Sequence, residues 1–308
     1  MVEVVRDRAG GPWRCWKAAY AFICGLLALV AHASQLQAAP LVRAGAPKPW
    51  IQTLEAPAAD GGRFLLSDRQ VLIGVRDVQS YTRWVQAISD ESALDAAAQV
   101  TIEFEADETL VLHHVRVMRA GVTTDRLVMS DVRLAQREQR LEQQIYDGRQ
   151  TAILFVPDLR IGDVLDYAYT LQSRSTQPSE KYYGEFALGM STPAARLHLR
   201  VVAPSTRPLS DVWHGPSESA APDRQKLERD GHTEYVWDLR STPAYPSEPN
   251  TPDWYNPVPW LQLTEFASWA EVAEWGRRVV SAAADRDLAI QQFLNELPAG
   301  PLEQRILQ

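Results

Sequence analysis

The sequence has only two cysteines, Cys15 and Cys24, and both precede residue 25. Without further thiols the chain cannot build a disulfide framework, so its stability has to come from buried apolar area. The sequence also lacks a glycine-rich phosphate loop and the G-x-S-x-G turn that carries the nucleophile of many serine hydrolases. The shortage of cysteine excludes a small protein held together by disulfides. The sequence also has no local motif for phosphate binding or for a serine nucleophile of these two kinds.

Histidine is scarce, with six in 308 residues. Those beyond residue 40 form no H-x-H or H-E-x-x-H pattern, the spacings in which zinc ligands commonly occur. Residues 110–119 (LVLHHVRVMR) predict a strand, in which regular alternation would point His113 and His114 to opposite faces. We therefore expect no metal site and no cofactor.

Residues 1–39 have the composition of a secretory leader. Four basic side chains precede an uncharged apolar run at 18–30, and small residues follow at Ala31, Ala33, Ala38 and Ala39. The apolar run is shorter than the roughly 20 residues that a membrane-spanning helix needs. The sequence predicts a cleaved signal peptide and an exported protein, which contacts a membrane only if the leader is retained.

The rest of the chain is acidic. The whole sequence has 31 lysines and arginines against 39 aspartates and glutamates, and the leader contains four of the former and two of the latter. The exported part therefore has 27 basic and 37 acidic side chains, a formal net charge of −10. Nucleic-acid binding needs clustered lysine and arginine opposite the phosphates, so we expect no nucleic-acid partner.

Residues 63–240 have the pattern of a mainly β domain. Short runs of β-branched and aromatic residues alternate with turn residues, which is typical of an antiparallel β-sandwich. The expected strands before residue 130 are 71–75, 82–88, 99–105, 110–119 and 126–129. Residues 40–62, rich in alanine and proline, form a lead-in to this domain.

The stretch 146–170 predicts two strands, 151–156 and 164–171, on either side of a turn. We interpret the two strands as a hairpin. Its expected partner strands are 186–190, 196–202 and 234–239. Residues 132–144, just before it, are highly charged, and their pattern fits a short helix and an extended connection equally well.

The composition changes at residue 241. Residues 241–265 contain six prolines, which fix φ and remove backbone donors, so we expect a linker without regular structure. Three aromatic residues lie in it: Trp254, Tyr255 and Trp260. Their rings either pin the linker to the sheet or stay exposed as a platform on which a sugar or a peptide stacks.

After the linker, residues 266–308 are expected to be helical. The first covers 266–280, with Ser268 as its N-cap and Glu271 at the capping-box position. A second is expected from about 285 to 297 and a third from Pro301, in which the sequence stops. The predicted fold is therefore an antiparallel β-sandwich followed by a proline-rich linker and short C-terminal helices.

Three carboxylates, Asp158, Asp163 and Asp166, lie close together in the sequence. A pair of carboxylates is the machinery of glycoside hydrolysis, but it requires a separation that spacing along the chain does not establish. Aspartate is also common in turns, where it accepts hydrogen bonds from the local backbone. We favour the turn role for these residues.

The order of these segments resembles the DUF3857 domain, a β-domain found in front of transglutaminase-like domains in exported bacterial proteins. The resemblance covers roughly residues 65 to 300. It rests on residues 112–121 (LHHVRVMRAG), 146–148 (YDG), 157–167 (PDLRIGDVLDY) and 266–275 (FASWAEVAEW). None of these motifs is catalytic, but their order and spacing together are specific.

The resemblance implies that a papain-like core would follow, in which a cysteine is activated by a histidine and oriented by an aspartate. Residues 301–308 look like the first turns of its opening helix, so no residue of this chain is carried over as catalytic. We expect a non-catalytic periplasmic module whose partner is a transglutaminase-like domain in cis or in trans. The alternatives are a stand-alone module that binds glycan or peptide and a hydrolase that uses carboxylates.

Overall fold

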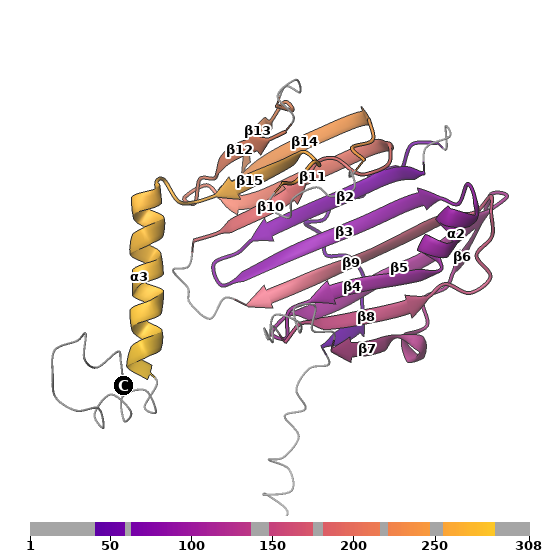
Figure 1. The fold of residues 1–308 in the computed structure, drawn as a ribbon, viewed down its shortest axis with the longest axis horizontal. Helices are drawn as coiled ribbons and strands as arrows, with labels where there is room; N and C mark the ends of the chain where they lie inside the picture. Colours follow the sequence, from indigo (N-terminus) through magenta and orange to yellow (C-terminus); the bar gives the residue numbers. More distant parts are fainter. Residues whose placement is uncertain are drawn as a thin grey trace, which may run out of the picture. The chain divides into compact units, whose positions relative to one another are not determined.

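The computed structural model describes residues 41–58, 63–136, 148–174, 181–215, 221–246 and 255–286 (Figure 1). Most of these residues lie in strands, and nine strands form one large sheet. Its order is β1–β5–β9–β3–β2–β11–β14–β13, with β6 paired to β5. The strands are β1 (Val42–Ala44), β2 (Phe64–Ile73), β3 (Asp77–Ala87), β5 (Thr109–Arg119), β6 (Val122–Asp125), β9 (Val164–Arg174), β11 (Ala194–Pro204), β13 (Gln225–Arg229) and β14 (His232–Thr242).

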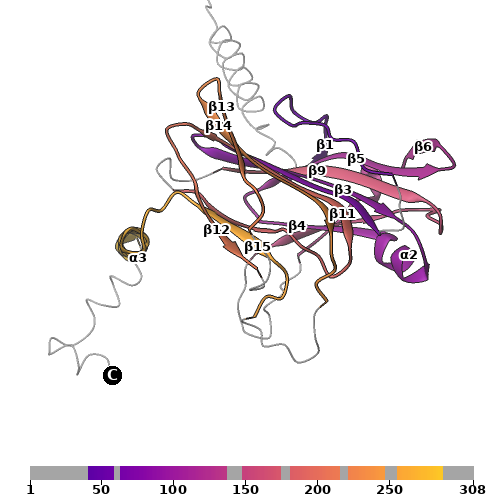
Figure 2. The same cartoon turned by 90° about the horizontal axis from the view of Figure 1, so that it is seen from above.

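Two smaller sheets have three antiparallel strands each. The first has the order β4–β8–β7, from β4 (Gln99–Phe104), β8 (Gln150–Phe155) and β7 (Arg133–Gln136). The second has the order β10–β15–β12, from β10 (Tyr183–Ala187), β15 (Trp260–Thr264) and β12 (Ser210–His214). Figure 2 shows strands of both small sheets in a second layer beside the large sheet.

One face of the large sheet is apolar, and the small sheets cover it. One buried cluster joins β5 and β9 to β4, β8 and helix α2 (Glu91–Ala97). Another joins β2, β11 and β14 to β10 and β15, and it contains the fully buried side chains of Trp237 and Leu263. These two clusters confirm the predicted β-sandwich.

The opposite face of the large sheet is polar, because side chains alternate between the faces along each strand. In β11, Leu197 and Leu199 are on the apolar face, whereas His198 and Arg200 are on the polar one. The consequence is a row of buried charged and amide groups, which forms the first candidate site below.

The predicted hairpin of 151–156 and 164–171 is wrong. Both strands exist as β8 and β9, but β8 pairs with β4 and β7 in a small sheet, while β9 pairs with β3 and β5 in the large one. The expected partners also pair elsewhere: β10 with β15, and β11 with β14 and β2. Turn residues therefore mark a crossing between layers here, which the sequence does not distinguish from a hairpin.

The expectation that His113 and His114 face opposite ways is also wrong. The register between β5 and β9 shifts between Leu112 and His114, so β5 contains one extra residue at this point. His113 contacts Thr170 and His114 contacts Asp166, two residues on the same face of β9. A β-bulge of this kind interrupts the two-residue alternation and brings both imidazoles to the polar face.

Several boundaries differ from the sequence prediction. β2 begins at Phe64 rather than at 71, and β6 precedes the predicted strand 126–129, whose last residue opens a short 3₁₀ turn, Met129–Asp131. Of residues 132–144, Arg133–Gln136 form β7, and 137–144 lie outside the described residues. Strand β15 occupies the end of the predicted linker, and its Leu261 and Leu263 belong to the core.

The helices differ as well. Helix α2 was not predicted, although Asp90 precedes an alanine-rich run and its Oδ1 accepts from Ala93 N at 2.8 Å, a normal N-cap. Helix α3 (Trp269–Arg286) is continuous past the predicted break near 281–284, and the rest of the expected second and third helices lies outside the described residues. Ser268 caps α3 through its hydroxyl, 3.3 Å from Glu271 N.

If β15 is part of the core, Leu263→Ala should lower the free energy of unfolding by about 2 to 5 kcal/mol, because it leaves a cavity at a side chain with no exposed surface. Urea titration of the purified chain measures this loss. Leu227→Ala on the exposed edge strand β13 is the matched control and should cost less than about 0.5 kcal/mol. Equal costs for the two substitutions would contradict the assignment of β15 to the core.

Candidate functional site

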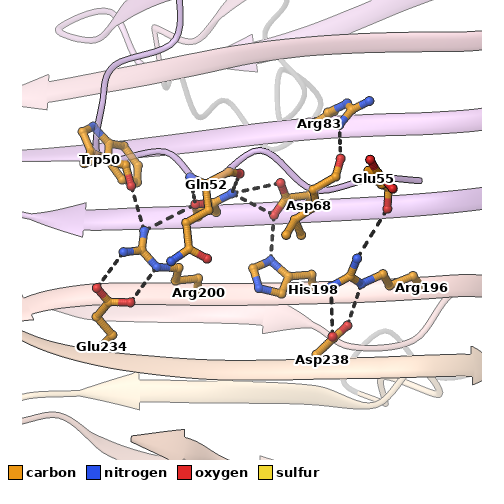
Figure 3. A network of polar contacts seen from close by, with 12 residues as sticks. Trp50, Gln52, Glu55, Asp68, Arg83, Arg196, His198, Arg200, Glu234 and Asp238 are labelled. Atoms are coloured by element: carbon orange, nitrogen blue, oxygen red, sulfur yellow. Dashed lines mark hydrogen bonds and ion pairs between the residues drawn. The ribbon is translucent and has the colours of Figure 1, made fainter. Parts of the chain in front are cut away.

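The first candidate site is the polar row on the polar face of the large sheet (Figure 3). Its members come from neighbouring strands, so residues distant in sequence meet side by side. We define the polar row as Asp68 and Gln70 of β2, Arg83 of β3, His114 of β5, Asp166 of β9, Arg196, His198 and Arg200 of β11, and Glu234 and Asp238 of β14.

Asp68 and Gln70 are the most deeply buried members, with 1% and 0% of their surface exposed. His198 Nδ1 donates to Asp68 Oδ1 at 2.8 Å, and Gln70 Nε2 donates to Asp68 Oδ2 at 3.0 Å. On the other side of Gln70, Arg200 Nη1 lies 3.4 Å from Oε1. Partners of this kind are required, because a buried carboxylate without them is strongly destabilising.

Arginine–carboxylate pairs continue the row across β11 and β14. Arg200 Nε donates to Glu234 Oε2 at 3.0 Å. Arg196 approaches Asp238 with two parallel hydrogen bonds of 2.8 and 3.0 Å. The register of the two antiparallel strands places each acceptor two residues from the position directly opposite its arginine, within reach of the long guanidinium side chain.

Asp166 binds two partners at once. Arg83 donates to both of its carboxylate oxygens, at 2.8 and 2.9 Å, and His114 Nε2 donates to Oδ1 at 3.0 Å. Burial alone would raise the pKa of Asp166, but the hydrogen bonds from His114 and Arg83 outweigh it and lower the pKa to about 2. The carboxylate is therefore ionised at neutral pH and held by two donors.

The neighbouring His113 is neutral. Burial lowers the pKa of His113, and its Nδ1 donates to the carbonyl of Gly45 at 2.7 Å. Its Nε2 is then an acceptor, 2.7 Å from the hydroxyl of Thr170. Among the residues that the structure describes, no three His, Cys, Asp or Glu side chains gather in an arrangement that could hold a metal ion.

A segment of the lead-in covers the polar row. Residues 48–58, which we call the strap, run above β2, and the side chains of the row bind the strap through its main chain (Figure 3). Leu54 and Ala56 of the strap also pack against a small apolar cluster that contains Leu66 and Val85. The lead-in is therefore part of the folded domain.

The carboxylates Asp158 and Asp163 lie in a different place from Asp166. Arg119 bridges them: Nε and Nη2 donate to Asp163 at 2.7 Å each, and Nη1 donates to Asp158 at 3.1 Å. Hydrogen bonds from Arg160 and Arg119 lower the pKa of Asp158, and the one from Arg119 lowers the pKa of Asp163. A general acid needs the opposite shift, so these carboxylates have the electrostatics of structural ion pairs.

The second candidate site is a groove of about 380 Å³ between α3 and the sheet β10–β15–β12, which we call the aromatic groove. Its main lining residues are Tyr183, Val212, Gln262, Phe266, Trp269 and Trp275. Trp269 is 86% exposed and Tyr183 is 62% exposed, so large apolar surfaces face solvent here. Exposed aromatic surface gathered in a groove is the usual mark of a binding surface.

The groove is held in shape at the start of α3. The ring of Trp275 meets the rings of Tyr183 and Phe266 edge to face, with centroids 6.4 and 5.7 Å apart. Lys181, just before β10, forms an ion pair with Glu271 of α3. Farther along the helix, Val279 and Val280 are exposed, so part of the apolar surface of α3 faces solvent.

The sequence-predicted aromatic platform is only partly visible. Trp254 lies outside the described residues, and Tyr255 is exposed. Trp260 is half-buried at the start of β15, and its ring stacks on His214 with the centroids 3.9 Å apart and the planes 9° from parallel. The platform therefore stays a prediction.

Sequence reasoning missed both candidate sites. The signal for the groove was the helical spacing of Trp269, Val272 and Trp275, of which the third was not recognised, and nothing in the sequence joined Tyr183 to it. The signal for the polar row was an arginine or histidine at every second position of one predicted strand, namely Arg196, His198 and Arg200. Neither pattern identifies its partners, because those come from other strands.

The low pKa of Asp166 predicts a pH-dependent loss of stability. Its folded pKa of about 2 lies below the ordinary 3.8, so its contribution is complete above pH 4 and disappears as the pH falls from about 4 to about 2. Over that interval, chemical denaturation should show that the wild type loses about 2 kcal/mol more than Asp166→Asn. Parallel losses in the two proteins would contradict this account.

Comparison with solved structures finds the same fold elsewhere. A crystal structure of a "putative protease" from Parabacteroides distasonis matches with a TM-score of 0.64 and 15% identity, over 81% of this chain and 49% of that one. The chain thus spans about half the length of that protein, and at this identity the likeness shows the fold alone. None of the curated proteins compared with the chain matches it.

No helix among the described residues is long and apolar enough to cross a membrane.

The model of one family matches residues 76–246, from the start of β3 through β14 and into the proline-rich segment. That family is described as a domain of unknown function with solved structure, DUF3857. Because the match covers more than half of the chain, the chain belongs to the DUF3857 family.

Proposed function

We propose that this chain is a non-catalytic, exported accessory module that docks through the aromatic groove onto a transglutaminase-like domain of the papain-like cysteine class. In that role it positions the catalytic domain or restricts access to it. The observation that carries the proposal is the aromatic groove, where Trp269 and Tyr183 present ring surface to solvent beside a partly unburied helix.

The position of the groove in the chain supports this partner. Helix α3 forms one wall of the groove, so a domain connected to the chain after α3 would be tethered to the same element that carries the exposed Trp269. The solved structure that shares this fold has roughly as much chain again outside the shared part. A second domain in contact with α3 would bury the exposed Trp269, Val279 and Val280.

The chemistry of the described residues supports a non-catalytic role. The papain-like reaction needs a thiolate, and the cysteines of this sequence are Cys15 and Cys24, both in the predicted leader. Asp158, Asp163 and Asp166 are all paired with arginines, and the pKa of each is lowered. The reactive cysteine would come from the partner domain.

The purified chain should therefore hydrolyse neither peptides nor glycosidic substrates above the rate in buffer. Fluorogenic casein and a set of nitrophenyl glycosides provide the assay, with Asp158→Asn and Asp166→Asn prepared in parallel. Turnover by the wild type that either substitution abolishes would establish the carboxylate hydrolase instead.

The docking surface is tested with the domain itself. The coding sequence beyond codon 308 should encode a transglutaminase-like domain with its cysteine, histidine and aspartate in that order. Calorimetric titration of that domain into the chain should show binding that Trp269→Ser weakens at least tenfold, since tryptophan anchors dominate such interfaces. Val122→Ser, an exposed apolar position on β6, is the control and should leave the affinity unchanged.

Equal affinities for Trp269→Ser and the wild type would contradict docking at the groove.

The second candidate function, a module that binds glycan or peptide by itself, is favoured by the exposure of Tyr255. It predicts oligosaccharide or peptide binding by the chain that Tyr255→Ser abolishes, in the absence of any encoded catalytic domain.

A further inference from the structure

We propose that the polar row is a binding site for an extended peptide, which it recognises through main-chain groups, and that the strap is its intramolecular occupant. The site is distinct from the aromatic groove. It lies on the polar face of the large sheet, whereas the sheet that forms the groove packs against the apolar face. The two proposals can therefore fail independently.

The amide of Gln70 binds the strap as a neighbouring β-strand would. Gln52 N donates to Gln70 Oε1 at 2.9 Å, and Gln70 Nε2 donates to Gln52 O at 2.6 Å. One side chain thus satisfies both the donor and the acceptor of a single residue of the strap. Because these groups are present in every residue except proline, the contact does not depend on the side chain at position 52.

The neighbours of Gln70 fix the orientation of its amide. Asp68 accepts from Nε2, and Arg200 donates toward Oε1, so a flipped amide would place like groups together on both sides. His198 in turn holds Asp68. A donor and an acceptor are therefore presented to the strap in a fixed order before the peptide arrives, which lowers the entropic cost of binding.

Arginines of the row bind three further carbonyls of the strap. Arg200 Nη1 donates to Trp50 O at 2.9 Å, and Arg83 Nη1 donates to Leu54 O at 2.7 Å. Arg196 Nη1 contacts Glu55 O at 3.4 Å. Main-chain groups at 50, 52, 54 and 55 are bound in this way. Trp50 lies in the turn that the hydrogen bond from Ile51 N to Lys48 O closes, and residues 52–58 form no helix or turn, so their main-chain groups are available to the row.

The strap is poised to exchange. Among the described residues, its backbone–backbone hydrogen bonding is local, from Ile51 N to Lys48 O, so side chains alone tie it to the sheet. The surface beneath it consists mainly of charged and amide groups, which water can solvate when the strap leaves. Leu66 and Val85 are the apolar exception, and Leu54 and Ala56 of the strap cover them.

Apolar side-chain contacts add selectivity. Leu54 packs on Leu66 and Val85, whereas the side chains of Gln52 and Glu55 are exposed. The ligand class is therefore an extended peptide with an apolar residue two positions after the residue that Gln70 binds. Trp50 Nε1 also donates to Gln79 Oε1 at 3.3 Å, and Ala56 packs beside Leu54, whereas the exposed positions 52 and 55 tolerate most side chains.

The test uses the full chain with its own strap loosened by Trp50→Gly and Leu54→Gly. A synthetic peptide with the sequence of residues 47–58 (PKPWIQTLEAPA) should bind this variant in calorimetry. The wild type should bind it at least tenfold more weakly, since its tethered strap competes at a high effective concentration. The same peptide N-methylated at Gln52 should lose about tenfold in affinity, as should the variant that also contains Gln70→Met.

Failure of a folded, cooperatively unfolding variant to bind the peptide at millimolar concentration would overturn the proposal, and so would equal binding of the N-methylated peptide. Hydrogen exchange of the wild type provides a measurement that needs no variant. The amide of Gln52 should exchange at least a hundredfold faster than that of Val71 in β2, by opening of the strap alone. Exchange of both amides at the rate of global unfolding would show that the strap does not open by itself and would also overturn the proposal.

Discussion

A charge removed from water needs an opposite charge or a hydrogen-bonding partner close by, and one whole face of the large sheet is built around this demand. Asp68, Asp166, Glu234 and Asp238 each meet a histidine or an arginine from a neighbouring strand. These pairs depend on the register between strands, because a slip by one residue would turn every partner to the opposite face. The polar face and the apolar core therefore require the same alignment.

The two faces of the sheet then have separate roles. The apolar face gathers the small sheets and, through β10 and β15, supports α3 and the aromatic groove. The polar face holds the strap. A partner that docks on α3 and a peptide that occupies the polar row would not compete for the same atoms, so one domain can have two binding surfaces.

The sequence predicted the β-rich character, because a periodic apolar run such as that of β11 indicates a strand regardless of which strand it pairs with. It could not predict pairing. β8 and β9 have the expected strand patterns, yet they belong to different sheets, and a turn with Gly162 reads the same in a hairpin and in a crossover. The bulge at His113 is likewise invisible to alternation, since one extra residue in β5 exists only relative to β9.

The candidate sites were hidden for the same reason. In the sequence Gln70 is an ordinary strand residue. It can bind main-chain groups only because the fold places Asp68, Arg200 and the strap around it. Tyr183 and Trp275 are 92 positions apart and meet only through the fold. The sequence analysis placed the aromatic platform in the proline-rich segment instead, because aromatic residues among prolines are conspicuous in the sequence itself.

The composition of the polar row is itself informative about its role. Apolar side chains of similar size often stabilise a fold as well as a buried ion-pair network does, so stability alone gives little reason for so many charges on one face. An apolar layer under the strap would also leave the carbonyls of Trp50, Leu54 and Glu55 without donors. The carbonyls of Trp50 and Leu54 are partly buried and need donors such as Arg200 and Arg83, and the carboxylates of the row are what allow guanidinium groups to be placed there. The charges thus follow from the presence of a peptide above the sheet, and a face selected only for rigidity would have no need of them.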